Sequence, residues 1–377
     1  MKRETVVLLN VTMALVLVGV LMVYSAGTVQ TYRTDEPTMG HHFGFLIGQL
    51  IRVAIGLAGL FIAANFDYHY FQKRSILGIL IAVMLTLLVL VLIFADVRLG
   101  GRRWLSLYGF SVQPSDLARI VLIVYLAVKL SENQEQLRSL FKGVLPPIGV
   151  AGLFLGLIML QRDIGTPVVL GAVALGMLLM AGAKLWHLGM LTGLFVVPVL
   201  TYIHLNPHAQ ERIYSFRDPW KYRLGEGYQL IQSLWAFARG GVMGQGPGAG
   251  QQKLAYLPEA HSDFIFAVWA EEMGLVGTVG VVLLFGLFVI MGLRIAACAP
   301  DLLGALLAAG LTTMIGLQAL LCMGVTTGML PTKGMTLPFI SAGGTALIVN
   351  LTMVGMLINV AMQAEEHVPK RSMAKAH

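Results

Sequence analysis

Residues 256–274 change from a polar, proline-containing loop into an apolar helix, and Asp263 lies at the changeover. A helix that begins near Pro258 or Ser262 has free N–H groups and the positive end of its dipole at this point. Both features keep a carboxylate charged and facing water. Such a carboxylate is suited to act as a general base. The alternative is that Asp263 only caps the helix, since Ser and Asp are favoured N-cap residues.

Other ionisable residues lie close by in the same segment: Glu259, His261, Glu271 and Glu272. The last two fall inside an apolar run that is long enough to span a membrane, where carboxylates are costly and usually paired or functional. Arg52, in another apolar run, is a candidate partner for them, and a functional role of its own is the alternative. This concentration of polar groups favours a site around Asp263 over a simple cap.

Basic residues gather in short connections elsewhere in the chain: Arg102, Arg103, Arg162 and Lys333. Cationic groups in tight loops predict an anionic ligand, with pairing to nearby acidic residues as the alternative. Trp104 follows two of the arginines and can either lie at the membrane interface or stack on a sugar. Asp163 follows Arg162, and it either caps the next helix or contributes to the site of Asp263.

Two further segments carry polar groups at membrane depth. Asp116 and Arg119 are three residues apart, just after a proline that suits a helix start. They lie on one helix face and can pair, so the sequence predicts an ion pair that holds the helix end, with a place in the site as the alternative. Residues 329–341 contain two prolines and predict an interrupted helix, which is typical of cavities in transporters and lipid-processing enzymes.

The composition identifies a membrane protein. Of the 377 residues, 57% are hydrophobic and 12% are charged, against about 25% charged residues in soluble domains, and the mean hydropathy is +0.78. Cys298 and Cys322 lie in or beside apolar runs, so neither a disulfide nor a metal cluster is expected. The net charge of +7 fits anionic lipid headgroups, an anionic substrate or positive cytoplasmic loops. No nucleic-acid partner is expected.

Ten apolar runs have the roughly 17–25 residues needed to cross a bilayer: 6–27, 45–65, 76–95, 114–130, 144–161, 166–183, 186–204, 264–293, 302–325 and 342–362. An even number of spans places both termini on one side. Basic residues near the termini predict that this side is the cytoplasm: Lys2, Arg3, Lys370, Arg371 and Lys375. The sequence therefore predicts an all-α polytopic membrane protein in which residues 1–377 form a single domain, with a short cytoplasmic tail at 363–377.

One connection is long. Residues 205–262 are predicted to lie outside the cell and contain a short amphipathic run at 230–238, with Trp235 and Phe237. Such a run is typical of an interfacial or re-entrant helix. Residues 240–250 follow as a glycine-rich loop that is expected to be flexible. A nucleotide-phosphate loop is excluded, because the sequence lacks the Gly-Lys-Ser/Thr ending and a preceding strand.

Several of these motifs occur together in an order that resembles the SEDS family (shape, elongation, division, sporulation), the polytopic peptidoglycan polymerases that include FtsW and RodA. They are Leu-Pro-Glu-Ala-His-Ser-Asp-Phe-Ile-Phe-Ala at 257–267 with Glu-Glu-Met-Gly at 271–274, Arg-Trp-Leu at 103–105 with Gln-Pro-Ser-Asp at 113–116, Gln-Arg-Asp-Ile-Gly-Thr at 161–166, Gly-Tyr-Gln at 227–229 and the segment 330–344. The resemblance covers essentially the whole chain. The run Pro-Thr-Lys-Gly-Met-Thr-Leu-Pro at 331–338 is more similar to FtsW than to RodA, with a RodA-like elongation polymerase and a sporulation-type relative as the alternatives.

The resemblance implies a peptidoglycan glycosyltransferase. It would polymerise lipid II, the undecaprenyl-pyrophosphoryl disaccharide-pentapeptide, into glycan strands at the outer face of the bacterial cytoplasmic membrane, during cell division at the septum. The implied partners are a class B penicillin-binding transpeptidase of the FtsI type and other divisome membrane proteins. A lipid II flippase that moves the precursor without chemistry, and a membrane scaffold that only recruits the transpeptidase, are the alternatives.

The resemblance also implies roles for single residues. Asp263 matches the family's essential aspartate and would be the general base of an inverting transfer, since an α-linked pyrophosphate gives a β-linked product. Glu271 lies eight residues further on, about 12 Å along a helix, which is too far for the carboxylate pair of a retaining enzyme. Asp116 and Arg119 match a buried ion pair. No cofactor and no dedicated metal site are expected, with a divalent ion as an alternative partner for the pyrophosphate. The residues expected to bind the substrate are Arg102, Arg103, Trp104, Arg162, Asp163, Glu259, His261, Ser262, Lys333 and Ser341.

Overall fold

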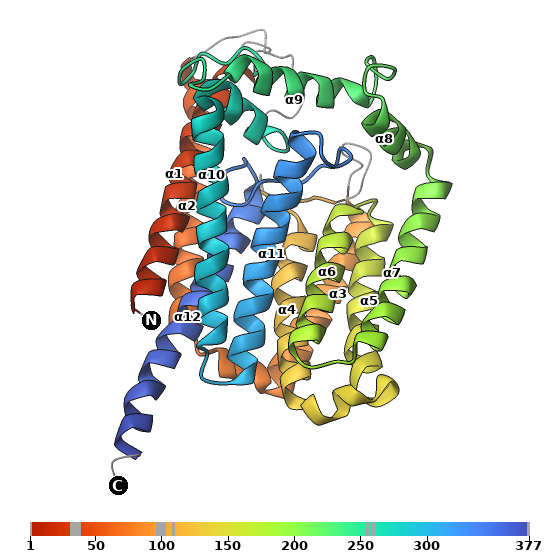
Figure 1. The fold of residues 1–377 in the computed structure, drawn as a ribbon, viewed down its shortest axis with the longest axis vertical. Coiled ribbons are helices and arrows are strands. Elements are labelled where there is room, and N and C mark those ends of the chain that lie inside the picture. The colour runs from red at the N-terminus through yellow and green to blue at the C-terminus, as the bar shows by residue number, and fades with distance from the viewer. Residues whose placement is uncertain are drawn as a thin grey trace.

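The computed structural model describes residues 2–30, 39–95, 103–107, 110–253, 257 and 261–374. They form a bundle of helices with further helices lying across one end (Figure 1). The helices of the bundle are α1 (Lys2–Gln30), α2 (Met39–Asn65), α3 (Arg74–Phe94), α4 (Pro114–Glu132), α5 (Leu145–Leu160), α6 (Gly165–Met180), α7 (Leu185–Leu205), α10 (Ile265–Ala297), α11 (Leu302–Thr326) and α12 (Gly344–Ala374). The connections contain η2 (Tyr68–Gln72), β1 (Leu105–Leu107) antiparallel to β2 (Phe110–Val112), η3 (Gln134–Arg138), η4 (Leu140–Val144), α8 (Pro207–Arg217) and α9 (Gly227–Gly240).

Each of the ten predicted apolar runs coincides with a helix of the bundle. Within the described part of the chain, eight helices are long and apolar enough to cross a membrane. Of the other two, α6 is apolar but has 16 residues, and α4 has 19 residues that include charged side chains at both ends. Neighbouring helices bury most of α4 and α6. The predicted all-α polytopic fold is therefore confirmed.

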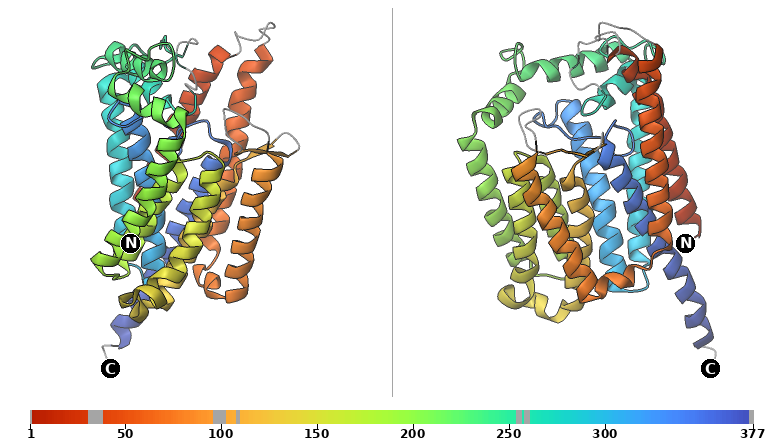
Figure 2. Two further views of the ribbon diagram at one scale, coloured as in Figure 1. Left: turned by 90° about the vertical axis from the view of Figure 1, so that its right-hand side faces the viewer. Right: turned by 180° about the vertical axis from the view of Figure 1, so that it is seen from behind.

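Both termini lie at the same end of the bundle (Figures 1 and 2). We call this end the terminal end, and we call the opposite end, where α8 and α9 lie across the helices, the capped end. The connections from α3 to α4, from α5 to α6 and from α11 to α12 also lie toward the capped end (Figure 1). The loops that carry the described site residues therefore meet at one end of the molecule, as the predicted topology requires.

Close helix contacts in the bundle depend on small residues. α11 and α12 are mostly buried, whereas α7 lies at the edge, against α6. Between α2 and α12, a side chain at Gly355 would collide with the backbone of Leu60, and a side chain at Gly56 would collide with Leu351. Helices in a membrane associate through such close packing, because lipid tails are as apolar as the side chains they would replace.

α10 is not one continuous helix. Gly274 has a φ of +66° and a ψ of −163°, a conformation that is essentially restricted to glycine. It divides α10 into a short helix at 265–273 and a long helix at 275–297. A Cβ on Gly274 would also collide with the backbone of Val242 and Gly244. The span predicted at 264–293 is thus two helices, and only the long one crosses the bundle.

The glycine-rich loop 240–250 packs against this break. Gln245 and Gly246 donate backbone hydrogen bonds to the carbonyls of Glu271 and Glu272, and carbonyls of the loop accept from the first residues of the long helix. These bonds satisfy the backbone groups that a broken helix leaves without partners. The prediction of a flexible loop is wrong, since several of its glycines lie too close to α10 to carry a side chain.

Glu272 forms a buried ion pair at the break. Its Oε1 lies 2.7 Å from Lys253 Nζ and also accepts a hydrogen bond from Ser25 of α1. Both charged side chains are at least nine-tenths buried. Because Lys253 donates to Ser25 and to the Gly248 carbonyl as well, this pair joins α1, the glycine-rich loop and α10.

Glu271 is satisfied by the two residues that directly follow this loop. Its two carboxylate oxygens accept backbone hydrogen bonds from Gln251 and Gln252, each at 3.0 Å, and Arg239 of α9 lies 4.0 Å away. The prediction that Arg52 pairs with Glu271 or Glu272 is therefore wrong. Both carboxylates lie beside α9 at the capped end, held by contacts that the sequence pattern did not indicate.

The connection between α11 and α12 returns into the bundle, as the interrupted segment predicted at 329–341 implies. Leu337, Phe339 and Ile340 are each at most 2% exposed. Phe339 has a φ of +65°, and the backbone of Phe339 and Ile340 lies so close to Gly19 of α1 that a side chain there would not fit. This segment is a packed part of the core.

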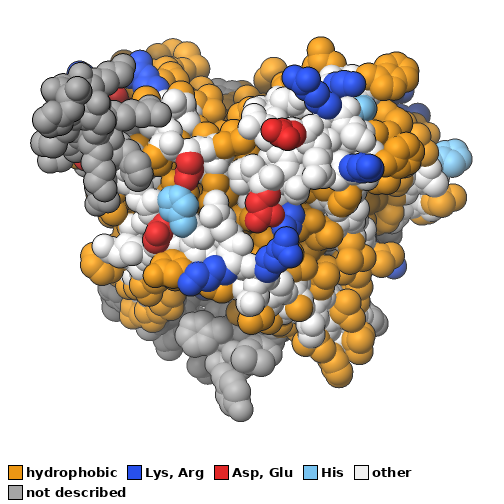
Figure 3. All heavy atoms as spheres, turned by 90° about the horizontal axis from the view of Figure 1, so that it is seen from below, with side chains coloured by type: hydrophobic (Ala, Val, Ile, Leu, Met, Phe, Trp, Pro, Cys, Tyr) orange, Lys and Arg blue, Asp and Glu red, His pale blue; other side chains and the backbone are white. Residues whose placement is uncertain are grey.

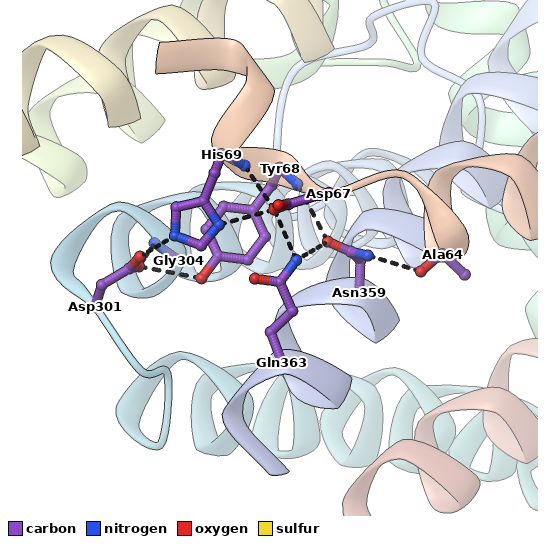
Figure 4. A network of polar contacts seen from close by, with 8 residues as sticks. All are labelled: Ala64, Asp67, Tyr68, His69, Asp301, Gly304, Asn359 and Gln363. Carbon is purple, nitrogen blue, oxygen red and sulfur yellow. Dashed lines mark hydrogen bonds and ion pairs between the residues drawn. The ribbon is translucent and has the colours of Figure 1, made fainter. Parts of the chain in front are cut away.

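Polar residues gather on the face at the terminal end, with hydrophobic side chains around them (Figure 3). At the centre of one network, His69 of η2 lies between two carboxylates (Figure 4). Its Nδ1 is 2.8 Å from Asp67 Oδ1 and its Nε2 is 2.6 Å from Asp301 Oδ2. The Tyr68 hydroxyl donates a hydrogen bond to Asp301. The connection from α2 to α3 is thereby joined to the start of α11.

α12 belongs to the same network. Asn359 donates to the carbonyl of Ala64 at 2.7 Å and accepts from the backbone N–H of Tyr68, while Gln363 donates to Asp67 at 2.8 Å (Figure 4). The α2–α3 connection, the start of α11 and the helix α12 are therefore fixed to one another at the terminal end by side-chain hydrogen bonds.

This network predicts a pH-dependent contribution to stability. Burial opposes a positive charge on His69, but the hydrogen bonds to Asp67 and Asp301 and the charges of these residues outweigh it and raise the pKa of His69. Because the pKa is higher in the folded state, the protonated imidazole stabilises the fold fully at pH values below the pKa of the unfolded state, about 6.5. This stabilisation is lost as the pH rises through the pKa of the folded state. The Tm of the wild type should therefore be higher than that of His69→Gln at about pH 6. This difference in Tm should be smaller at about pH 9.

The measurement is a thermal unfolding scan of the purified proteins at both pH values. His204→Gln, at an exposed position in the last turn of α7, is the matched control and should follow the wild type. A Tm difference between the wild type and His69→Gln that is the same at both pH values would contradict the role of the charged imidazole.

Candidate functional site

A cavity of about 420 Å³ lies at the capped end. Its walls come from the residues before β1, the α5–α6 connection, the end of α7, α8, α9, the start of α10 and the α11–α12 connection. It brings together five residues that the sequence singled out: Arg103, Arg162, Asp163, Asp263 and Lys333. These residues are far apart in the sequence, so the fold alone places them in one cavity.

Asp263 immediately precedes the short helix of α10. The helix begins at Ile265 with Phe264 as its N-cap residue, so Asp263 lies one residue before the capping position. A Cβ placed on Gly334 would lie 2.8 Å from Asp263 Oδ2, which shows that the carboxylate lies against the α11–α12 connection. Asp263 is partly exposed and lines the cavity. A partly exposed carboxylate at a helix start can be both charged and reachable by a ligand.

Asp163 both caps a helix and lines the cavity. Its Oδ1 accepts the backbone N–H groups of Gly165 and Thr166, at 3.0 and 3.2 Å, and its Oδ2 accepts the hydroxyl of Thr166 at 2.7 Å. The side chain is buried. The two roles that the sequence left open are therefore compatible. Because three hydrogen bonds already hold it at the start of α6, Asp163 is suited to fix the shape and charge of the wall.

Four cationic side chains line the same cavity: Arg103, Arg162, Arg212 and Lys333. Against them stand two carboxylates, those of Asp163 and Asp263. Arg212 is exposed and pairs with Glu226 at 3.1 Å, and Arg103 donates to the carbonyl of Arg162. The excess of positive charge makes the cavity attractive to an anion.

The effect of the excess positive charge is clearest at Lys333. It is half-buried, and its Cε lies 3.2 Å from where a Cβ on Gly165 would be, so its chain runs beside the start of α6. Burial, together with the nearby charges of Arg212 and Arg103 and against the opposing charge of Asp163, lowers the pKa of Lys333 to about 8. An anionic ligand would restore the charged form and would itself be held more tightly.

Two polar atoms at the cavity wall are buried without a hydrogen-bond partner among the described residues. They are Oγ1 of Thr332 and Nε of Arg103. Buried polar atoms are nearly always paired, so an unpaired atom at a cavity wall indicates a place for a ligand atom. A hydroxyl and a guanidinium N–H are both able to bind anionic oxygen.

The loop that carries Asp263 is joined to the α11–α12 connection by buried hydrogen bonds. The Ser341 hydroxyl donates to the carbonyl of Ser262 at 2.6 Å and accepts from the backbone N–H of Leu337. The backbone N–H of Ala342 donates to the carbonyl of His261. None of Ser341, His261 and Ser262 lines the cavity. The structure thus places these three residues where they position Asp263, and their predicted contact with a substrate stays a prediction.

The pair predicted at the start of α4 is present and buried. Arg119 lies 2.8 Å from Asp116 and donates to Gln318 of α11 at 2.8 Å. Gln318 in turn donates to the carbonyl of Thr336 at 2.8 Å. These contacts form a continuous chain from the ion pair to the connection that carries Lys333 and Gly334, so the pair supports the cavity wall from behind.

The remaining predicted residues lie elsewhere. Trp104 is half-buried next to β1, beside Arg103, and does not line the cavity. Arg102 and Glu259 lie outside the described residues. Among the residues that the structure does describe, there is no group of three acidic, histidine or cysteine side chains arranged to hold a metal ion.

Among the polar residues of the cavity, sequence reasoning did not assign Arg212, Gln229 and Thr332 to the site. Charges in a long external loop carry little topological information, so Arg212 was indistinguishable from the other basic residues at 205–262. For Gln229 the available signal was the motif Gly-Tyr-Gln at 227–229, which is part of the resemblance described above. Gln229 lies in the first turn of α9.

The chain is similar in sequence to proteins of one family. The family model for cell cycle proteins of the FtsW, RodA and SpoVE type matches residues 5–366. The chain is 40% identical to a probable peptidoglycan glycosyltransferase FtsW of Geobacter sp. strain M18 over 357 residues, which covers 94% of this chain and 96% of the relative. It is 38% identical to the stage V sporulation protein E of Bacillus subtilis strain 168, with the same coverage of both chains.

Solved structures show the same fold. A chain in the structure described as "Structural coordination of polymerization and crosslinking by a peptidoglycan synthase complex" is 28% identical, with a TM-score of 0.76 over 95% of this chain and 97% of that one. The crystal structure of the rod shape determining protein RodA of Thermus thermophilus is 26% identical, with a TM-score of 0.67 over 95% and 96% of the two chains. The family match, the identities and the shared fold agree with the motifs around Asp263, and the chain belongs to the SEDS family of FtsW, RodA and SpoVE proteins.

Proposed function

We propose that the protein is a peptidoglycan glycosyltransferase that polymerises lipid II into glycan strands, with Asp263 as the general base. The observation that supports this most strongly is the cavity in which Asp263 lies together with Arg103, Arg162, Arg212 and Lys333. A glycosyl transfer from a lipid pyrophosphate needs one base for the acceptor and positive charge for the leaving group. The cavity offers both.

The reaction follows from these groups. Asp263 accepts the proton of an acceptor sugar hydroxyl as the hydroxyl oxygen attacks the anomeric carbon of the donor from the face opposite the pyrophosphate. The new carbon–oxygen bond forms while the bond to the pyrophosphate breaks, so the α-linked donor gives a β-linked product. The pyrophosphate leaves with the electron pair, and the cationic wall stabilises its charge. One carboxylate suffices, because the cationic wall stabilises the leaving pyrophosphate and no general acid is needed to protonate it.

The orientation in the membrane is part of the proposal and rests on the basic residues near the termini. The capped end, with the cavity, is assigned to the outer face of the bacterial cytoplasmic membrane and both termini to the cytoplasm, in agreement with the basic residues near the termini. The similarity to FtsW supports a role in cell division at the septum. The similar structure that joins polymerisation with crosslinking supports a class B penicillin-binding transpeptidase as partner, alongside other divisome membrane proteins.

Asp263→Asn tests the chemistry. The amide keeps the shape of the side chain but cannot accept the proton, so glycan polymerisation by the purified protein with lipid II and its transpeptidase should fall by about 10²–10⁴-fold. Binding of lipid II should persist, since the cationic wall is unchanged. Glu135→Gln, at an exposed position of η3 at the terminal end, is the control and should polymerise like the wild type.

The same assay separates an enzyme from a flippase. A flippase needs no base, and it would give no polymer in detergent but would move the precursor across a sealed bilayer. Near-wild-type polymerisation by Asp263→Asn would exclude this residue as the base. A wild type that makes no polymer with its partner present, yet moves lipid II across vesicles, would favour transport.

Lys333 predicts the alkaline limb of the pH profile. Its pKa of about 8 in the free protein means that the ammonium loses its proton above that pH, and kcat/KM should fall there because kcat/KM reports the free enzyme. Lys333→Arg stays charged at all these pH values, so its kcat/KM should remain level to at least about pH 9, even if it is lower throughout. Lys221→Arg, in the exposed part of the long connection, is the control. If kcat/KM of Lys333→Arg falls at the same alkaline pH as that of the wild type, the fall is due to the titration of another group.

The topology is tested by chemical labelling. In a variant without Cys298 and Cys322, a cysteine that replaces Gly225 lies at the capped end and one that replaces Gln134 lies at the terminal end, and both positions are exposed. A membrane-impermeant thiol reagent added to intact cells should label the first and not the second. Labelling with the opposite preference would place the cavity in the cytoplasm and would remove Asp263 from the outer face.

A further inference from the structure

A second cavity, of about 440 Å³, lies along α9 at the capped end. We call it the outer cavity; its walls are residues of the α8–α9 connection, α9, and Gln251 and Gln252, which directly follow the glycine-rich loop. It shares no lining residue with the cavity of Asp263. The residues that line the outer cavity have no role in the glycosyl transfer described above.

The outer cavity combines aromatic rings with cations and amides. Trp220, Tyr228 and Trp235 supply the rings, and Arg223 and Arg239 supply the charges. Among the residues that the structure describes, no carboxylate lines it. Flat aromatic rings pack against the C–H faces of pyranose sugars, amides bind sugar hydroxyls, and guanidinium groups bind carboxylates. The chemistry of the lining therefore fits a saccharide that carries acidic groups.

The lining is held in place before any ligand binds. Arg239 lies over the ring of Trp235, with 5.8 Å from Cζ to the ring centroid, and donates to the side chain of Gln251 at 2.9 Å. The backbone N–H groups of Gln251 and Gln252 are in turn fixed by the fully buried carboxylate of Glu271. A preorganised site loses less side-chain freedom on binding than a flexible surface does.

One buried atom of the outer cavity has no partner. Gln252 is 2% exposed, and its Oε1 forms no hydrogen bond with any residue that the structure describes. Buried acceptors of this kind are rarely left unpaired. A ligand with hydroxyl or amide donors would satisfy it, whereas a lipid acyl chain would not. The unpaired oxygen thus points to a polar ligand.

α9 separates the outer cavity from the cavity of Asp263. Tyr228 lines the first and its neighbour Gln229 lines the second. From Tyr228 to Arg239 the outer cavity follows α9 for about 16 Å, at 1.5 Å per residue, the length of a few linked sugar rings. A strand that leaves the cavity of Asp263 across the first turn of α9 would reach the outer cavity directly.

We propose that the outer cavity binds the glycan product: a saccharide strand whose peptide stems carry carboxylates. The inference rests on the proposed polymerase function and extends it, because it gives the growing strand a second point of attachment. An enzyme that holds its product between additions adds further units before release. The outer cavity is then a determinant of strand length and not part of the catalytic machinery.

The direct test is a titration that needs no turnover. The Asp263→Asn protein, purified in detergent, is titrated calorimetrically with lipid-free peptidoglycan strands of at least four sugars, released by a muramidase and carrying their peptide stems. Binding is expected, and adding Trp235→Ala should weaken it by about tenfold or more, as for an aromatic anchor in a buried contact. Trp186→Ala is the matched control, because Trp186 is 81% exposed in the first turn of α7, at the other end of the helix from α8.

Arg223→Gln gives a second variant, at an exposed position in the α8–α9 connection, in case Trp235→Ala destabilises the fold. It should weaken binding of strands with peptide stems more than binding of strands without them, since it removes a carboxylate partner. In the active protein, Trp235→Ala should leave the rate of lipid II consumption within about twofold of the wild type, a change of about 0.4 kcal/mol, and should shorten the strands on a gel.

The possible failures are distinct. If strands do not bind to the Asp263→Asn protein while the wild type polymerises lipid II, the outer cavity is not a product site and the proposed function stands. If strands bind but the wild type makes no polymer, the proposed function fails instead. Unchanged strand length and strand binding in Trp235→Ala, with loss only of association with the transpeptidase, would overturn the inference and assign the outer cavity to a protein partner.

Discussion

A helix that breaks inside a membrane protein exposes backbone N–H and C=O groups that lipid cannot satisfy, and the rest of this site depends on how the chain meets that constraint at Gly274. The glycine-rich loop 240–250 pairs with the freed backbone, while Glu271 and Glu272 pair with that loop and with Lys253. The segment 265–273 can therefore run as a separate short helix. Asp263 precedes the first turn of that helix, so contacts at one end of it set the position of the proposed base at the other.

The opposite wall of the cavity is held in a comparable way. The α11–α12 connection has no regular structure of its own, and two buried sets of hydrogen bonds fix it. One runs from Arg119 through Gln318 to Thr336, and the other joins Ser341 to Ser262. Irregular backbone within a bundle persists only where its groups are satisfied in this way. Buried polar networks of this kind are costly to break in part, since each lost partner leaves an unpaired group.

The sequence predicted the ten helices because the length of an apolar run is a local property. It also predicted five of the six charged residues that line the cavity, because charges such as Arg162 and Lys333 stand out in a chain with few charges. The break at Gly274 and the partners of Glu271 and Glu272 could not be predicted. They depend on contacts with a loop 20 to 30 positions earlier, whose glycines indicate flexibility when read alone. Arg212 was missed for a related reason, since a charge within a long loop has no fixed place until the loop folds.

The segment that returns into the bundle beneath Lys333 has an energetic consequence. Leu337, Phe339 and Ile340 are almost completely buried, and the backbone of Phe339 and Ile340 lies against Gly19 of α1, so this part of the connection is an apolar packed layer. An ion at the cavity mouth would have to cross this hydrocarbon layer without its hydration shell, which is prohibitively expensive. The proposed transfer would then take its free energy from the pyrophosphate linkage of the precursor and not from a flow of ions through the protein.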